Sequence, residues 1–255
     1  MKVMVAGRAS RHMNIRLSSV LLAVASYIQP VLADGDAIRI DRTEVTIAAF
    51  ADYVAATGTV TAAERSGGMV YEAGWTSKPG WNWRTPYGVA GLPGEPAVHI
   101  TYDEAAAYCA WRGARLPTRD EWITNAYTER RAAPPPPFVN GRTYPYPTGD
   151  TPKGANCLRD CGNVTGNPVG KTDYAGILMR GHGHAVAGST VAGVNGLHDM
   201  GANVWEWATL KDGRQQATMG GSWWYGKAQM TADYGATKPR DMAAVYIGFR
   251  CIMDE

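Results

Sequence analysis

The stretch PAVHITYDEAAAYCAWRGARLPTRDEW, residues 96–122, decides the fold class because it holds two helix starts in close succession. Both have the T-x-x-E spacing of a capping box, in which each side chain bonds the other residue's backbone amide; the pairs are Thr101 with Glu104 and Thr118 with Glu121. The first pair predicts a helix over 102–112 that ends at Gly113. The second predicts a helix over 119–131, which must end before the prolines at 134–137.

Outside this stretch the two halves of the chain differ. A third helix is predicted over 47–57, with Thr46 before it and Gly58 as its stop. After residue 140 no helical period lasts ten residues, and short apolar stretches alternate with Gly, Asn and Pro. The alternation over 204–207 suits a strand with one buried face. We therefore expect a single loop-rich α+β domain without internal repeats.

The composition agrees with a loop-rich fold and excludes one class of function. Among 255 residues, 30 are glycine and 15 are proline, which argues against a helical bundle. Trp and Tyr far outnumber Phe, which places many rings where apolar packing meets hydrogen bonds or water. Lys and Arg number 25, Asp and Glu 23, and no basic run occurs. We therefore expect no nucleic-acid partner, since such proteins usually carry a basic patch.

The N-terminus has the pattern of a secretory signal. Residues 17–29, LSSVLLAVASYIQ, are apolar and uncharged but shorter than the roughly 20 residues of a membrane span. A basic residue precedes them and small residues follow, so we expect residues 1–33 to be a signal peptide cleaved after Ala33. Met13 is an alternative start. The domain would then occupy 34–255 in the periplasm or outside the cell, without a stable membrane anchor; a buried N-terminal helix is the alternative.

Export makes the four cysteines candidates for disulfides. Four cysteines allow three pairings. Cys157 and Cys161 share one Gly- and Asn-rich loop, so a local bridge is the simplest choice, and it leaves Cys109 with Cys251. The alternative for the local pair is a redox or metal role, although its C-x-x-x-C spacing differs from C-x-x-C and no second ligand-spaced pair exists.

Six motifs in order resemble the formylglycine-generating enzyme, or sulfatase-modifying factor, family. The resemblance runs from about Ile38 to Ile252 and rests on RIDRTEVTIAAFADYVAATG, the opening stretch PAVHITYDEAAAYCAWRGARLPTRDEW, YPYPTGD, GLHDMGANVWEW, GGSWW and IGFRC. It implies a C-type-lectin-like α+β fold. It also implies a disulfide between Cys109 and Cys251, because the family pairs cysteines at these positions.

The resemblance implies a calcium site in GLHDMGANVWEW. Asp199 and Glu206 would supply side chains, and Ala202 and Val204 would supply carbonyl oxygens. The residues themselves suit this role, because two carboxylates and free carbonyls in a glycine-containing turn can wrap Ca²⁺, which takes six to eight oxygens. The order Gly201-Ala202 reverses the family's usual Ala-Gly, which a carbonyl ligand tolerates. The alternative is that the two carboxylates cap backbone amides without a metal.

A second family calcium site would begin at Asn156 with the next carbonyl, that of Cys157. Its remaining ligands should precede Pro168. This chain is shorter there, carries Cys161, and offers Asp160 as the one available acid.

The chemistry is where this chain departs from the family. The family's oxidases hold copper with two cysteines, at the third and eighth residues after the serine of Gly-Gly-Ser. Counted from Ser222, those positions are Tyr225 and Met230. Because soft thiolates suit Cu(I), oxidation of a sulfatase cysteine by copper is not expected. The surrounding residues would form an aromatic cleft for a small molecule or peptide; its candidate members are Trp205, Ser222, Trp223, Trp224, Tyr225, Met230 and Arg250.

Residues 173–194 read as an insertion relative to the family. It carries His182 and His184, with His198 following, and the two imidazoles could share a metal such as copper or zinc, or could be solvated histidines of a surface loop. Whether a redox metal, copper or iron, binds there stays open. His99, in AVHI, is expected to be structural within a strand.

Three functions follow from these expectations. The first is an exported oxidative tailoring protein for a small peptide or siderophore precursor, because exported family members without the cysteine pair include one that matures the pyoverdine siderophore. The alternative is a non-catalytic lectin-like binding protein. A formylglycine-generating oxidase comes third because of Tyr225 and Met230. The family's sulfoxide synthases need an added iron-binding helical domain, for which the chain has no room.

Overall fold

The computed structural model describes residues 39–72, 74–161, 183–210 and 215–254. The expected signal segment and His182 lie outside these residues. Within them, no helix combines the length and the apolar character needed to cross a membrane.

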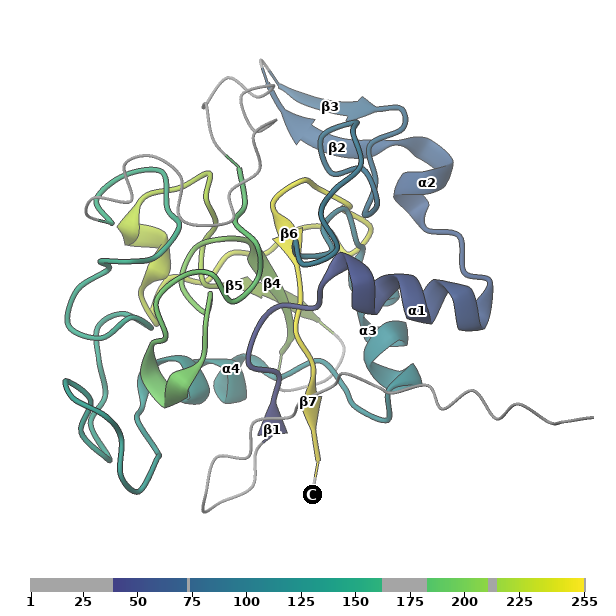
Figure 1. Cartoon of the computed structure of the whole chain (residues 1–255). Coiled ribbons are helices and arrows are strands. Elements are labelled where there is room, and N and C mark those ends of the chain that lie inside the picture. Colours follow the sequence, from purple (N-terminus) through teal and green to yellow (C-terminus); the bar gives the residue numbers. More distant parts are fainter. Residues whose placement is uncertain (1–38, 73, 162–182, 211–214, 255) are drawn as a thin grey trace, which may run out of the picture.

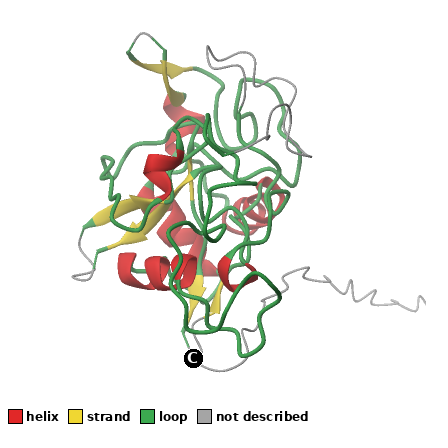
Figure 2. Cartoon of the chain, turned by 90° about the vertical axis from the view of Figure 1, so that its left-hand side faces the viewer, coloured by secondary structure: helices red, strands yellow, loops and turns green. Residues whose placement is uncertain are grey.

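The described chain is a single mixed helix and sheet domain in which long loops outweigh regular elements (Figures 1 and 2). The α-helices are α1 (Ile47–Thr57), α2 (Ala62–Ser66), α3 (Tyr102–Trp111) and α4 (Arg119–Tyr127), and two short 3-10 turns are η2 (Val194–Gly196) and η3 (Lys227–Met230). The strands are β1 (Arg39–Ile40), β2 (Gly68–Tyr71), β3 (Trp75–Lys78), β4 (Trp205–Thr209), β5 (Gln216–Met219), β6 (Ile247–Gly248) and β7 (Ile252–Met253).

The helix starts lie where the sequence predicts them. Thr46 caps α1 by accepting a hydrogen bond from the Ala49 amide, and Gly58 ends the helix with a left-handed φ of 69°. Both expected capping boxes are formed at the starts of α3 and α4. The sequence analysis missed α2, although Thr61 and Glu64 have the same T-x-x-E spacing and form a third capping box.

Helix α4 ends at Tyr127, so the predicted extent to residue 131 was wrong. Thr128 adopts an extended conformation and forms a bridge with Thr143. The next residue, Glu129, is buried and accepts hydrogen bonds from Arg131 and from the Asn195 amide. Contacts distant in sequence therefore stop the helix before the prolines do.

Three small sheets hold the loops together. Strand β4 is central, antiparallel to β5 with Glu206 opposite Met219, and parallel to β6 with Glu206 opposite Gly248. Strands β1 and β7 pair antiparallel and bring the start of the described chain beside its end (Figure 1). Strands β2 and β3 form a separate hairpin, at the top of Figure 1.

The core packs on both sides of β4. Helices α1 and α3 pack against each other, and α4 packs against β4 and β5. The first four residues of β4 are all buried, so the expectation of a strand with one buried face was wrong. The reason is that both faces are covered: Trp207 lies in the aromatic main core, while Ala208 packs with Trp122 of α4.

Both disulfides expected from the sequence are bonded. Cys109 of α3 is joined to Cys251, just before β7, and Cys157 is joined to Cys161 within one loop. No free cysteine occurs in the described chain. Two disulfides indicate an oxidising compartment.

His99 is structural, but it does not lie in a strand. Its φ is 58°, its side chain is fully buried, and its two ring nitrogens face the carbonyl oxygens of Pro86 and Ala243. Burial lowers the pKa of His99 to about 4. The AVHI sequence has strand-like composition, but a bend in the backbone turns His99 into the core.

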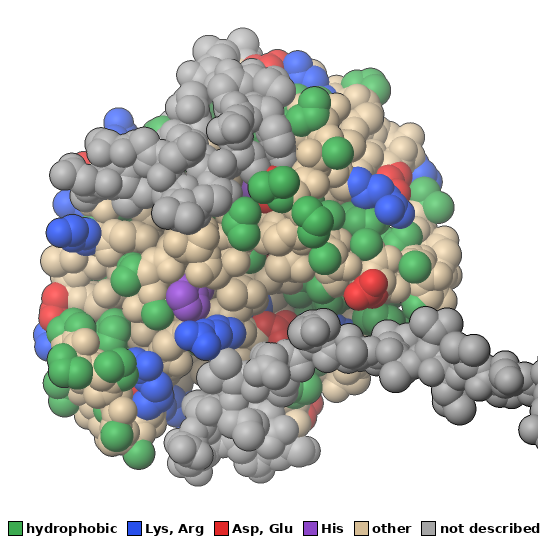
Figure 3. Space-filling model, in the orientation of Figure 1, with side chains coloured by type: hydrophobic (Ala, Val, Ile, Leu, Met, Phe, Trp, Pro, Cys, Tyr) green, Lys and Arg blue, Asp and Glu red, His purple; other side chains and the backbone are tan. Residues whose placement is uncertain are grey.

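The charged side chains form no continuous basic surface on the face seen in Figure 3. Lys and Arg lie there in separate small groups, several of them next to Asp or Glu. This face therefore gives no support to binding of a polyanion such as nucleic acid.

Candidate functional site

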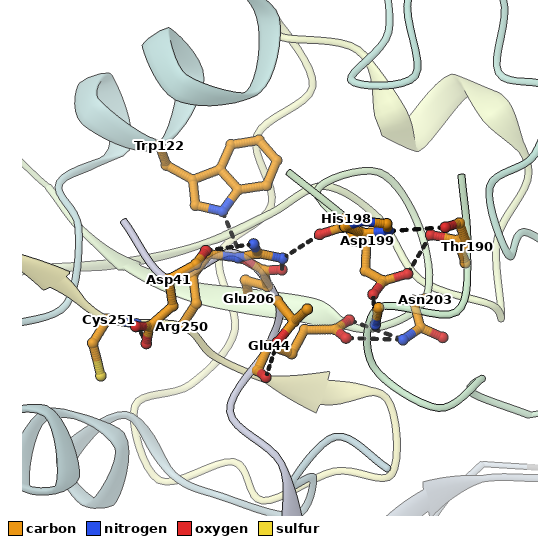
Figure 4. Close-up of polar contacts among 12 residues, drawn as sticks. Asp41, Glu44, Trp122, Thr190, His198, Asp199, Asn203, Glu206, Arg250 and Cys251 are labelled. Carbon is orange, nitrogen blue, oxygen red and sulfur yellow. Dashed lines mark hydrogen bonds and ion pairs between the residues drawn. The ribbon is translucent and has the colours of Figure 1, made fainter. Parts of the chain in front are cut away.

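A buried polar hub lies where the C-terminal segment meets the turn before β4 (Figure 4). We define it by five residues that are all almost completely buried: Glu44, Asp199, Asn203, Glu206 and Arg250. They come from three separate parts of the chain: the segment between β1 and α1, the turn that leads into β4 together with β4 itself, and the segment between β6 and β7.

The turn of the hub is built from left-handed residues. Asp199, Ala202 and Asn203 have φ values of 60°, 65° and 51°. Asp and Asn tolerate this conformation, whereas an alanine is strained in it. The turn directs the Asp199 carboxylate and the Asn203 amide into the protein.

Arg250 and Glu206 form a bidentate ion pair at the centre of the hub. The Arg250 Nε and Nη2 atoms each lie 2.7 Å from a carboxylate oxygen of Glu206. The guanidinium also donates to the carbonyl oxygens of Asp41 and His198, and Trp122 Nε1 donates to Glu206 Oε2 at 2.8 Å. Arg250 therefore belongs to the hub and does not line the aromatic surface on which the sequence analysis placed it.

Glu44 is a hub residue that sequence analysis missed. Asn203 Nδ2 donates to both of its carboxylate oxygens at 3.0 Å. Burial, together with the neighbouring charges of Asp199 and Glu206, raises the pKa of Glu44 well above its ordinary value. Burial also raises the pKa of Asp199. Three buried carboxylates thus share one guanidinium, an arrangement that a bound cation would relieve.

The oxygen atoms of the turn are suitable ligands for calcium. Asp199 accepts one hydrogen bond on each oxygen, from the Thr190 hydroxyl and the Gly188 amide, and Glu206 Oε1 accepts one. A carboxylate has about four lone-pair sites, so each retains capacity. Among hydrogen bonds between described residues, none ends on the carbonyl oxygens of Ala202 or Val204, although both residues are buried.

The carbonyl oxygens are essential to this fit. In the described ranges, no three side chains of His, Cys, Asp and Glu are grouped so that they could hold a metal ion. A cation in the turn would therefore take part of its ligands from the backbone, as Ca²⁺ commonly does.

We predict that Ala202→Gly stabilises the protein by about 0.5–1 kcal/mol, because the cost of a left-handed alanine exceeds the extra chain entropy of glycine. The measurement is urea unfolding. Ala208→Gly, in the regular strand β4, is the matched control and should destabilise. A loss of stability in Ala202→Gly would show that Ala202 is not strained by its left-handed conformation.

The expected second calcium site gains no support from its described residues. Asn156 Nδ2 donates to Gly183 O and to Asn203 Oδ1, so its side chain braces the hub. The disulfide of Cys157 leaves its carbonyl oxygen, the expected ligand, unaffected, and Asp160 is exposed. The segment that would supply further ligands lies outside the described residues.

An aromatic cluster lies on the face of β4 opposite to the hub. Its members are Trp75, Trp205, Trp224, Tyr225, Tyr234 and Tyr246. Tyr225 meets the Trp205 ring edge-on at 5.6 Å, and Tyr234 stacks on it at 6.0 Å. Trp75 and Trp224 pack against Tyr246, with ring centroids 5.9 and 6.1 Å away.

The aromatic cluster reaches the surface and carries one cation. Trp75 is 44% exposed and Tyr234 is 37% exposed, whereas Trp205 is buried. Lys238 Nζ lies 5.6 Å from the Trp205 ring centre, and burial lowers the pKa of this lysine. The indole nitrogen of Trp205 has no hydrogen-bond partner among the described residues. Exposed rings with a cation beside them can bind a flat ligand that carries an acidic or acceptor group.

The other residues predicted for the cleft are buried inside the protein. Ser222 accepts a hydrogen bond from the Trp224 amide at 3.3 Å, and the fully buried Trp223 has its ring centroid 5.0 Å from that of Trp224. Met230 is fully buried against Cys161. Of the predicted set, only Trp205, Trp224 and Tyr225 belong to the aromatic cluster.

His184 is not solvated, so the alternative of a solvated surface histidine was wrong for this residue; the other half of the expected metal pair, His182, lies outside the described residues. Its side chain is fully buried, with Nε2 2.7 Å from Glu95 Oε2 and Nδ1 3.0 Å from the Tyr87 hydroxyl. The neighbouring residues Gly188 and Thr190 bond Asp199. The described part of the insertion therefore contacts the hub directly, through hydrogen bonds to Asp199.

Comparison with known proteins places the whole domain in one group. A profile of the sulfatase-modifying factor enzyme 1-like domain matches residues 33–255. The formylglycine-generating enzyme of Thermomonospora curvata is 30% identical over 263 residues, which cover 84% of this chain and 81% of that enzyme.

Two further relatives show how activity varies among such proteins. A mouse protein named inactive C-alpha-formylglycine-generating enzyme 2 is 30% identical over 191 residues, 69% of this chain and 56% of that protein. The hercynine oxygenase of Mycolicibacterium thermoresistibile is 36% identical over 143 residues, 54% of this chain and 27% of the oxygenase. The chain thus spans about half or less of the length of these two relatives.

Among solved structures, PvdO from Pseudomonas aeruginosa superposes with a TM-score of 0.57 at 20% identity, covering 86% of this chain and 80% of PvdO. The structure of CarF gives a TM-score of 0.53 at 18% identity, covering 86% of each chain. These similarities show a shared fold.

Proposed function

Since this chain belongs to the sulfatase-modifying factor family, whose relatives include an oxygenase, we propose that it is an exported tailoring protein that oxidises an aromatic group on a small peptide or siderophore-like precursor. The aromatic cluster carries this proposal. It includes Tyr225, which stands at the position where the family's oxidases have a copper cysteine, and it offers rings and Lys238 in place of thiolates.

The residues of the cluster would bind and orient such a substrate. Tyr234, the exposed ring that lies on the buried Trp205, would stack on the ring of the substrate, and Lys238 would face its acidic or phenolic oxygen. A redox metal, copper or iron, would have to supply the electron transfer, and no described residues form a cluster of three His, Cys, Asp or Glu for it. A non-catalytic binding protein would use the same cluster without turnover.

The test incubates the purified protein with oxygen, Cu²⁺ or Fe²⁺, and a tyrosine-containing tetrapeptide or its leucine counterpart. The tyrosine peptide should quench tryptophan fluorescence and lose two hydrogens in mass spectrometry, with oxygen taking up the two electrons and two protons as hydrogen peroxide. Tyr234→Ala should weaken binding about three- to tenfold, from the loss of one ring contact. Trp111→Ala, an exposed ring at the end of α3, is the control and should bind normally. Binding of the tyrosine peptide without a product would support the non-catalytic binding protein. Absence of binding would contradict both the oxidising and the binding function.

We also predict that the protein does not convert a sulfatase-motif cysteine to formylglycine. Tyr225 offers a phenol, whose ordinary pKa is near 10, and the buried Met230 offers a neutral thioether, so the pair cannot supply two anionic sulfurs. The measurement is mass spectrometry of a sulfatase-motif peptide after incubation with protein, oxygen and copper. Conversion of cysteine to aldehyde above the level of a control without protein would contradict this prediction and show that the chain has the family's main activity.

We infer that the turn of the hub binds one Ca²⁺ through Asp199, Glu206 and the carbonyl oxygens of Ala202 and Val204. Ca²⁺ should raise the melting temperature by an amount that grows with its concentration, because it binds only the folded state. Asp199→Asn should largely remove this dependence, whereas Asp150→Asn, on the exposed surface, should keep it. An unchanged wild-type melting curve in chelator would show that the turn is no calcium site.

A further inference from the structure

Three sulfur atoms gather in a buried pocket of side chains outside the hub and the aromatic cluster. Cys161 Sγ lies 3.6 Å from Met230 Sδ, and Cys161 is bonded to Cys157. All three residues are buried. They form a small apolar group with Ala155 and Ala202, and Tyr146 packs against it. We call Cys157, Cys161 and Met230 the sulfur trio.

Backbone contacts fix the trio from both sides. The Leu158 amide, inside the disulfide loop, donates to Tyr225 O at 2.8 Å, which joins this loop to the segment before η3. The Tyr127 hydroxyl donates to Met230 O at 2.8 Å. Gly201 leaves space for the methionine, since a Cβ there would lie 2.7 Å from Met230 Cε. The disulfide loop and Met230 are therefore held next to each other by contacts outside the disulfide bond.

We propose that, once the Cys157–Cys161 disulfide is reduced, the sulfur trio forms a binding site for a soft monovalent metal ion such as Cu(I). Two thiolates and a thioether are the ligands that Cu(I) selects. In the described chain no His, Asp or Glu joins the two cysteines in a group of three potential ligands. A tetrahedral Zn²⁺ site, which needs four donors, is therefore not favoured.

The chemistry balances with a dithiol as reductant. The dithiol transfers two electrons and two protons to the disulfide, giving two cysteine thiols and the oxidised dithiol. Binding of Cu(I) then releases both thiol protons, because the thiolate is the ligand. The proposal rests on the three sulfurs alone and is independent of the proposed function.

The test reduces the folded protein with dithiothreitol without oxygen and identifies the opened disulfide by alkylation and mass spectrometry. After removal of the reductant, Cu(I) is titrated in competition with bicinchoninate. One Cu(I) should bind per reduced chain and none per oxidised chain, and X-ray absorption should show sulfur neighbours only.

Variants separate a metal site from a structural staple. Met230→Leu keeps the bulk of the side chain and should weaken Cu(I) binding by about tenfold or more, because it removes one of three soft ligands. Met219→Leu changes an equally buried methionine of another core cluster and should leave the affinity unchanged. Cys157→Ser with Cys161→Ser should abolish binding. Equal affinity of Met230→Leu and wild type, uptake by the double serine variant, or a disulfide that stays closed in the folded protein would overturn the proposal.

Discussion

Arg250→Met should destabilise the protein by about 3–5 kcal/mol, because it leaves buried carboxylates without their guanidinium. Arg250 holds both oxygens of Glu206 and also bonds two backbone carbonyls. Glu44 already carries a raised pKa from burial and from its acidic neighbours. Loss of the one cation would add to this repulsion, and methionine would fill the space without replacing any hydrogen bond.

The measurement is urea unfolding of Arg250→Met beside Arg240→Met. Arg240 pairs with Asp103 through the same bidentate geometry, but both side chains are exposed. Exposed pairs contribute about 0–1 kcal/mol, so this control should unfold near the wild-type midpoint. Adding Glu206→Leu to Arg250→Met should recover part of the loss, since an apolar replacement of both partners leaves fewer unpaired charges. Equal effects of the two arginine variants would show that the hub pair adds little.

The parts of the fold that sequence predicted are those encoded by neighbours in the chain. The start of α3 needs only Thr101 and Glu104, three residues apart, and both disulfides follow from the cysteine count and one short loop. The end of α4 depends on a bridge between Thr128 and Thr143, which no local pattern marks. Glu44 joins the hub through an amide at Asn203, more than 150 residues away.

Sequence analysis placed Arg250 in the aromatic cleft, but β4 separates Arg250 from the rings and puts it with the residues expected to bind calcium. Successive side chains of a strand point to opposite faces. Trp205 therefore lies in the aromatic cluster while Glu206 turns into the hub. Arg250 lies two residues after Gly248, the parallel partner of Glu206, and so reaches the same face as that carboxylate. The motifs identified the right residues, but strand register decides which of them meet.

Removing the disulfide between Cys109 and Cys251 should cost more than removing the one between Cys157 and Cys161. In the chain-entropy account a bridge stabilises by restricting the unfolded chain, and the effect grows with the loop it closes. The bridges span sequence separations of 142 and 4 residues. These separations correspond to about 5 and about 2 kcal/mol.

The comparison uses the double alanine variant of each pair, unfolded in urea under identical conditions. Alanine is chosen because Cys109 and Cys251 are fully buried in the main core, where a serine hydroxyl would lack a partner. The variant without the long-range bridge should have the lower midpoint. Its slope against denaturant should also be steeper than that of the wild type, because an uncrosslinked chain exposes more surface when it unfolds. A larger loss from the short-range pair would mean that native packing around the sulfur trio, and not chain entropy, determines what each bridge contributes.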